Sequence, residues 1–171
     1  MDEHPARDVE SARSSIRRTW TGHGRLVREE KDAVGLFLHD LVRVFGGVSV
    51  PAVPALFYVT GAVGPSASDL QAGALVGWLA LVVTATLVCG GWVGVPLTER
   101  PGWLSLSLRP SVIGVRLVVF NAAVLVAAAV GAAVAAVAGA AVAAGVALLV
   151  GVTTALGVPA LAERVYDAVE G

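Results

Sequence analysis

The chain has 171 residues, of which 56% are hydrophobic and 15% are charged, and its formal net charge is −1. Soluble domains are typically about 45–50% apolar and about 25% charged, so this composition excludes an ordinary water-soluble globule and indicates a membrane protein. Eight of the 12 basic and eight of the 13 acidic residues precede residue 46. Residues 1–45 are therefore predicted to form a cytosolic or interfacial segment, and the membrane domain follows at 46–163.

Two amphipathic helices are predicted before the membrane domain. Residues 1–22 show a weak helical stripe, which ends at the Gly-His-Gly sequence 22–24. Residues 25–45 carry a better stripe, made of Val34, Phe37, Leu41, Val44 and Phe45. Such a helix can lie in the headgroup layer with its apolar face down. The alternative, which the sequence leaves open, is that it packs on its own membrane domain or on a soluble partner.

The first two crossings are predicted at 46–63 and 70–95. The first contains Pro51 and Pro54, and because proline removes a backbone donor, we expect a kinked helix there. A turn-rich stretch at 64–69 separates it from the second crossing, which is long enough to span a bilayer with some tilt.

Two further crossings come from one uninterrupted apolar run. The 45 residues 117–161 contain no Asp, Glu, Lys, Arg or His. One helix of that length would extend about 67 Å, against a hydrocarbon core of about 30 Å. The run must therefore hold two helices, predicted at 111–134 and 140–162, with the turn at Gly139 because glycine tolerates a positive φ. A short cytosolic tail, 164–171, completes an all-α integral membrane protein, a four-transmembrane-helix bundle with an N-terminal amphipathic helical segment.

The basic residues set the expected orientation. They are abundant in the N-terminal segment, absent from the first loop, present in the second as Arg100 and Arg109, and absent from the third. Because basic residues near membrane ends prefer the cytoplasm, both termini are expected to be cytoplasmic, in the plasma membrane. A three-crossing arrangement would place the C-terminal tail outside, and Arg164 alone does not exclude it.

Polar residues within the crossings are the default candidates for function. Asn121 is the most polar residue deep in the apolar zone, and it is expected to bond a neighbouring helix, with a substrate or ion contact as the alternative. Arg116 is expected to snorkel to the cytosolic interface, with an anion or lipid-phosphate contact as the alternative. The candidate polar seam comprises Asn121, Arg116, Thr84, Thr86, Thr153 and Thr154.

Small residues four positions apart predict tight helix packing, within the chain or between copies, because they let two backbones approach closely. The glycines in such pairs are Gly73, Gly77, Gly90, Gly94, Gly131 and Gly139. Gly145, paired with Ala141, follows the same spacing.

The basic residues of the N-terminal segment are expected to touch anionic lipid headgroups: Arg13, Arg17, Arg18, Arg25, Arg28 and Lys31. Nucleic acid is not an expected partner, because acidic residues are interleaved and no recognition motif is present. The three histidines are scattered, which makes a poor metal site, and no cofactor is predicted.

No catalytic signature occurs in the sequence, since the metalloprotease, nucleophile-elbow, phosphate-loop and dinucleotide patterns are all absent. The chain is therefore expected not to be an enzyme. The leading hypothesis is a scaffold or accessory subunit that works by helix packing and has, as partner, another membrane protein or a second copy of itself. The alternative is a component of a small-solute or ion transporter or channel, with a path near Asn121.

Overall fold

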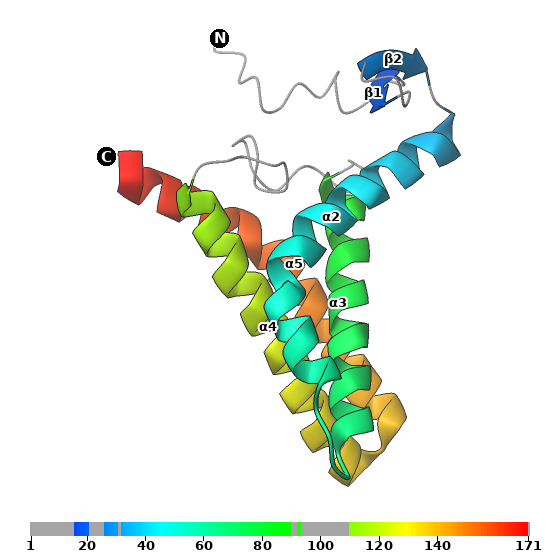
Figure 1. Ribbon diagram of the computed structural model, residues 1–171, viewed down its shortest axis with the longest axis vertical. Coiled ribbons are helices and arrows are strands. Elements are labelled where there is room, and N and C mark those ends of the chain that lie inside the picture. Colours follow the sequence, from blue (N-terminus) through cyan, green and yellow to red (C-terminus); the bar gives the residue numbers. More distant parts are fainter. Residues whose placement is uncertain (1–15, 21–25, 31, 90–91, 94–109, 171) are drawn as a thin grey trace.

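The computed structural model describes residues 16–20, 26–30, 32–89, 92–93 and 110–170, and its main body is a bundle of four helices (Figure 1). These are α2 (Ala33–Thr60), α3 (Ala67–Cys89), α4 (Pro110–Ala138) and α5 (Ala140–Glu170). Each contains a span long and apolar enough to cross a bilayer. The main body is therefore an all-α bundle and the protein a multi-pass membrane protein, because a helix satisfies its own backbone groups where water is absent.

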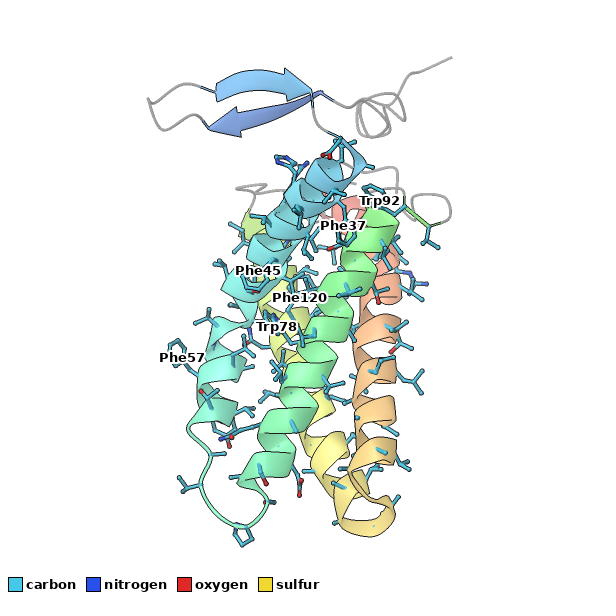
Figure 2. The ribbon with its side chains drawn as sticks, turned by 90° about the vertical axis from the view of Figure 1, so that its right-hand side faces the viewer. Phe37, Phe45, Phe57, Trp78, Trp92 and Phe120 are labelled. Atoms are coloured by element: carbon cyan, nitrogen blue, oxygen red, sulfur yellow. The ribbon has the colours of Figure 1, made fainter. Side chains whose placement is uncertain are left out.

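The helices alternate in direction. α2 begins and α5 ends at one end of the bundle, and the α2–α3 connection and the α4–α5 turn lie at the other (Figure 1). Helices α3, α4 and α5 pack on one another in all three pairs, and α2 packs on α3 and α4. The buried core joins α2 to α4 mainly through Val48, Ala52, Phe120 and Val124. Figure 2 shows Phe120 directed into the bundle and Phe57 directed away from it.

The helix boundaries differ from the sequence-based ones at several points. The segments expected separately at 25–45 and 46–63 merge into α2, which ends at Thr60. Pro51 and Pro54 lie inside this continuous helix, so the helix does not start late at Pro51. Helix α3 ends at Cys89, short of the predicted 95, and α5 continues through most of the predicted tail.

The N-terminal segment also differs from expectation. Residues expected in helices form an antiparallel hairpin of β1 (Ile16–Trp20) and β2 (Leu26–Glu30), with Arg17 opposite Glu29 and Trp20 opposite Leu26. Both strands contain β-branched or aromatic residues, which favour an extended backbone, and Gly22 and Gly24 lie between them. The remainder of the helix expected at 1–22 lies outside the described residues.

The turn between α4 and α5 is a single residue, and it falls at the predicted position. Gly139 has φ +83°, a left-handed conformation that disfavours any side chain. Its N–H donates to the carbonyl of Ala135 at 3.1 Å, and its carbonyl accepts from the N–H of Ala143 at 3.2 Å. One glycine thus completes the hydrogen bonds of α4 and begins those of α5.

Candidate functional site

Asn121 of α4 is a polar side chain that bonds to two helices. Its Oδ1 accepts a hydrogen bond from the backbone N–H of Ala55 at 2.7 Å, and its Nδ2 donates to the carbonyl of Pro51 at 2.7 Å. The Nδ2 group also donates to the carbonyl of Leu117 on its own helix. One amide therefore satisfies a donor and an acceptor of α2 and remains tied to α4.

The two α2 groups bonded by Asn121 are the pair that an undistorted α-helix would join to each other, because Ala55 follows Pro51 by four residues. The side-chain amide thus occupies a position in the backbone ladder of α2. Pro51 and Pro54 bracket this position, and since neither has an N–H, the carbonyls of Gly47 and Val50 lose their usual donors. A side chain inserted into the ladder and nearby prolines are both established causes of helix bending. Figure 1 shows α2 bent away from the bundle axis in its first half.

A second contact fastens α2 to α3 on the N-terminal side of the prolines. The indole Nε1 of Trp78 donates to Ser49 Oγ at 3.2 Å. The Trp78 ring also meets Phe45 edge to face, with 5.3 Å between centroids and 71° between the planes, as the two labelled side chains show in Figure 2. Polar contacts thus fix α2 to α3 and to α4 on either side of its first proline, Pro51.

The threonines of the candidate polar seam satisfy their hydroxyls locally. Thr86 donates to the carbonyl of Val82 and Thr154 to that of Val150, each at 2.8 Å, and Thr153 donates to the carbonyl of Leu149 at 2.8 Å. Such bonds to the preceding turn are the usual solution for a hydroxyl in an apolar helix. Thr84 is half-buried on α3. The bonds of Thr86, Thr153 and Thr154 stay within their own helices, whereas those of Asn121 bridge α4 and α2.

Arg116, which was expected to snorkel to the cytosolic interface, lies in the second turn of α4. It is 5% exposed within the bundle, on the side of α4 that also carries the buried Phe120 and Val124, four and eight residues further on. That spacing places all three on one face of the helix, directed at neighbouring helices. A buried guanidinium needs a partner, and Arg116 has one.

Three of the predicted packing glycines lie in close backbone contact. A Cβ added at Gly73 would come within 2.7 Å of the Ala127 carbonyl, and one at Gly131 would be 3.1 Å from Gly73 Cα. A Cβ at Gly77 would collide with the Ala127 side chain. Gly139 serves the turn instead, Gly145 has open space around it, and Gly90 and Gly94 lie outside the described residues.

Among the glycines that the structure describes, the closest contact occurs at Gly151, which was not among the predicted ones. A Cβ at Gly151 of α5 would overlap the carbonyl of Gly77 and lie 2.9 Å from the backbone nitrogen of Leu81. The sequence held a signal for it, because Ala147 and Gly151 form a pair of small residues four apart. Helices α3, α4 and α5 thus meet backbone to backbone around Gly73, Gly77 and Gly151.

The remaining candidates are metal ligands and the N-terminal basic residues. Within the described part of the chain, no group of three or more His, Cys, Asp or Glu side chains is placed to hold a metal ion. Of the basic residues expected to touch lipid, Arg17, Arg18 and Arg28 lie in the hairpin strands. Arg13, Arg25 and Lys31 lie outside the described residues.

Comparison with protein-family models, with curated proteins and with solved structures finds no match to this chain. What is established is a bundle of four apolar helices in which the side chain of Asn121 joins α4 to α2.

Proposed function

We propose that this membrane protein is a non-enzymatic scaffold or accessory subunit that works by helix packing. The observation that carries the proposal is the engagement of Asn121, whose amide is used by the backbones of α2 and α4. A half-buried amide with these three bonds fixes helix packing and has little capacity left to bind a solute. The local bonding of the threonine hydroxyls supports the same reading.

The backbone contacts of α3, α4 and α5 suit a structural role. Contacts through glycine and alanine leave little freedom for these helices to separate, because packed interiors have few voids. The outer face of α4 carries exposed small residues, Ala122, Ala129 and Ala133, at which a partner helix could approach closely.

The test is recovery of the tagged chain from native membranes after mild crosslinking. A stoichiometric membrane-protein partner, or a second, differently tagged copy, is expected to co-purify. Ala129→Phe should reduce its yield severalfold, whereas Leu148→Phe, at an exposed position of α5, should not. Recovery of the chain alone, with both variants indistinguishable from the wild type, would overturn the proposal.

Reconstituted vesicles separate this function from the transport alternative. Solute or ion flux that depends on the purified protein, and that Asn121→Leu changes while Thr153→Val does not, would favour a path near Asn121. The scaffold proposal expects the same background flux from vesicles with and without protein.

We further propose that the protein lies in the plasma membrane with both ends cytoplasmic, and that its N-terminal basic residues contact anionic headgroups. The segregation of Arg and Lys supports this orientation. The test uses intact cells that express the chain with Cys89 replaced by alanine and one new cysteine added. A membrane-impermeant maleimide should label Ser66→Cys, in the α2–α3 connection. It should label Arg164→Cys only after permeabilisation, and the reverse pattern would contradict the orientation.

A further inference from the structure

Helix α2 is longer than the hydrocarbon core is thick, and its first part, residues 33–45, carries charged side chains. At 1.5 Å per residue the 28 residues of α2 extend about 42 Å, more than the hydrocarbon core of about 30 Å. His39, Asp40 and Arg43 all lie in this first part. It also bends away from the bundle axis in Figure 1. The segment 33–45 therefore reaches the depth at which hydrocarbon gives way to headgroups and water.

One side of this segment is packed on the bundle, and its aromatic contacts fix the rotation of the helix. Phe37 meets Trp92 edge to face, with 5.5 Å between ring centroids. The indole Nε1 of Trp92 donates to Asp40 Oδ2 at 3.4 Å, and Val44 is buried one turn further on. Tryptophan is enriched at membrane interfaces, so Trp92 also marks the expected depth.

A second apolar side is left uncovered. Its four residues are spaced at i, i+4, i+8 and i+11, and their exposed fractions run from 46% to 70%: Val34, Leu38, Val42 and Phe45. Phe45 forms the edge of this side, because its ring also meets Trp78 of α3. On the helix they form one stripe, which we call the outer stripe. At 100° per residue the outer stripe is centred about 150° from Arg43 and Asp40. The segment is thus divided into a bundle side, a charged side and an uncovered apolar side.

We infer that the outer stripe is a membrane-surface contact, inserted among lipids at the boundary between headgroups and acyl chains. Three observations favour lipid as the occupant. The spanning part of α2 also exposes apolar side chains, Val53 and Phe57, so exposed apolar surface extends along the helix beyond the stripe. No charged residue belongs to it, and the charged side lies nearly opposite, as in helices that lie in the interface plane.

The sequence left open whether this helix lies on the membrane or packs on protein. We infer that one face packs on the bundle and that another face contacts lipid. The bundle side holds the helix at a fixed rotation, and the outer stripe then meets the lipid. The conclusion does not depend on the scaffold proposal, because it concerns the bilayer and not a protein partner.

Spin-label accessibility tests the inference on the full chain. Cys89 is replaced by alanine, and a nitroxide is attached to Leu38→Cys, Val42→Cys or Arg43→Cys in nanodiscs that hold one chain each. Arg43 is the matched control, since it is exposed and directly follows Val42. All three positions are exposed, and an unchanged elution profile on size exclusion verifies folding.

The ratio of collision rates with oxygen and with a water-soluble nickel complex reports the environment of each label. We expect this ratio to be severalfold higher at positions 38 and 42 than at 43. Nickel access at 38 and 42 equal to that at 43 would place the stripe in water and overturn the inference. Low access of both reagents at 38 and 42 would mean that protein covers the stripe, which also overturns it.

Discussion

Replacing Asn121 by leucine tests whether the amide fastens α2 to α4. Leucine keeps much of the volume and removes the two hydrogen bonds that Asn121 makes to Ala55 and Pro51. Interhelical side-chain bonds in membranes average about 0.6 kcal/mol and reach about 1.7 kcal/mol, so two give about 1–3 kcal/mol. The loss should fall in the lower half of this range, since the freed N–H and carbonyl of α2 can then bond each other.

The assay is reversible unfolding in mixed micelles of a mild detergent and dodecyl sulfate. We expect Asn121→Leu to lower the free energy of unfolding by about 1–2 kcal/mol. Thr153→Val is the matched control, because its hydroxyl bonds only to its own helix and is exposed. Equal stability of Asn121→Leu, the control and the wild type would refute the idea that this amide fastens the two helices.

The same unfolding assay checks three further predictions. Gly151→Ala, whose Cβ meets the backbone of α3, should cost roughly 1–3 kcal/mol or more, whereas Gly157→Ala, in open space, should be neutral or stabilising by up to about 1 kcal/mol. Equal effects at the two positions would contradict the observed packing. Gly77→Ala should also lower the free energy of unfolding, because the added Cβ would collide with the side chain of Ala127. Adding Ala127→Gly should restore part of that stability, and strictly additive effects of the two substitutions would be evidence against the contact. Gly139→Ala should cost about 1–2 kcal/mol through its positive φ alone, and an unchanged midpoint would count against the one-residue turn.

Sequence reasoning predicted the crossings because hydrocarbon imposes a simple length rule on apolar runs. The stretch 117–161 is too long for one helix and just long enough for two, and Gly139 was the residue best suited to a turn within it. The lengths of the apolar runs therefore sufficed to predict four spanning helices, and the backbone freedom of glycine sufficed to place this reversal of the chain.

What sequence reasoning missed depends on contacts between distant segments. The helical spacing in 1–22 is weak, and pairing between the two strands of the hairpin overrides it. Helix α2 runs through Pro51 and Pro54, and at Pro51 and Ala55 its backbone bonds the amide of Asn121 from α4. Nothing near the prolines in the sequence indicates that partner. The importance of Asn121 could be predicted from its polarity, but the identity of its bonding groups could not.

The insertion of Asn121 into α2 also has a consequence for biogenesis. Ala55 is made 66 residues before Asn121. At about 5–20 residues per second the ribosome needs about 3–13 seconds to cover that distance. During this interval the N–H of Ala55 and the carbonyl of Pro51 have each other as partners, because they are four residues apart and the amide of α4 has not yet been synthesised. We therefore expect the amide to enter α2 only after α4 is made, as a late step in which one backbone hydrogen bond of α2 is exchanged for two bonds to Asn121.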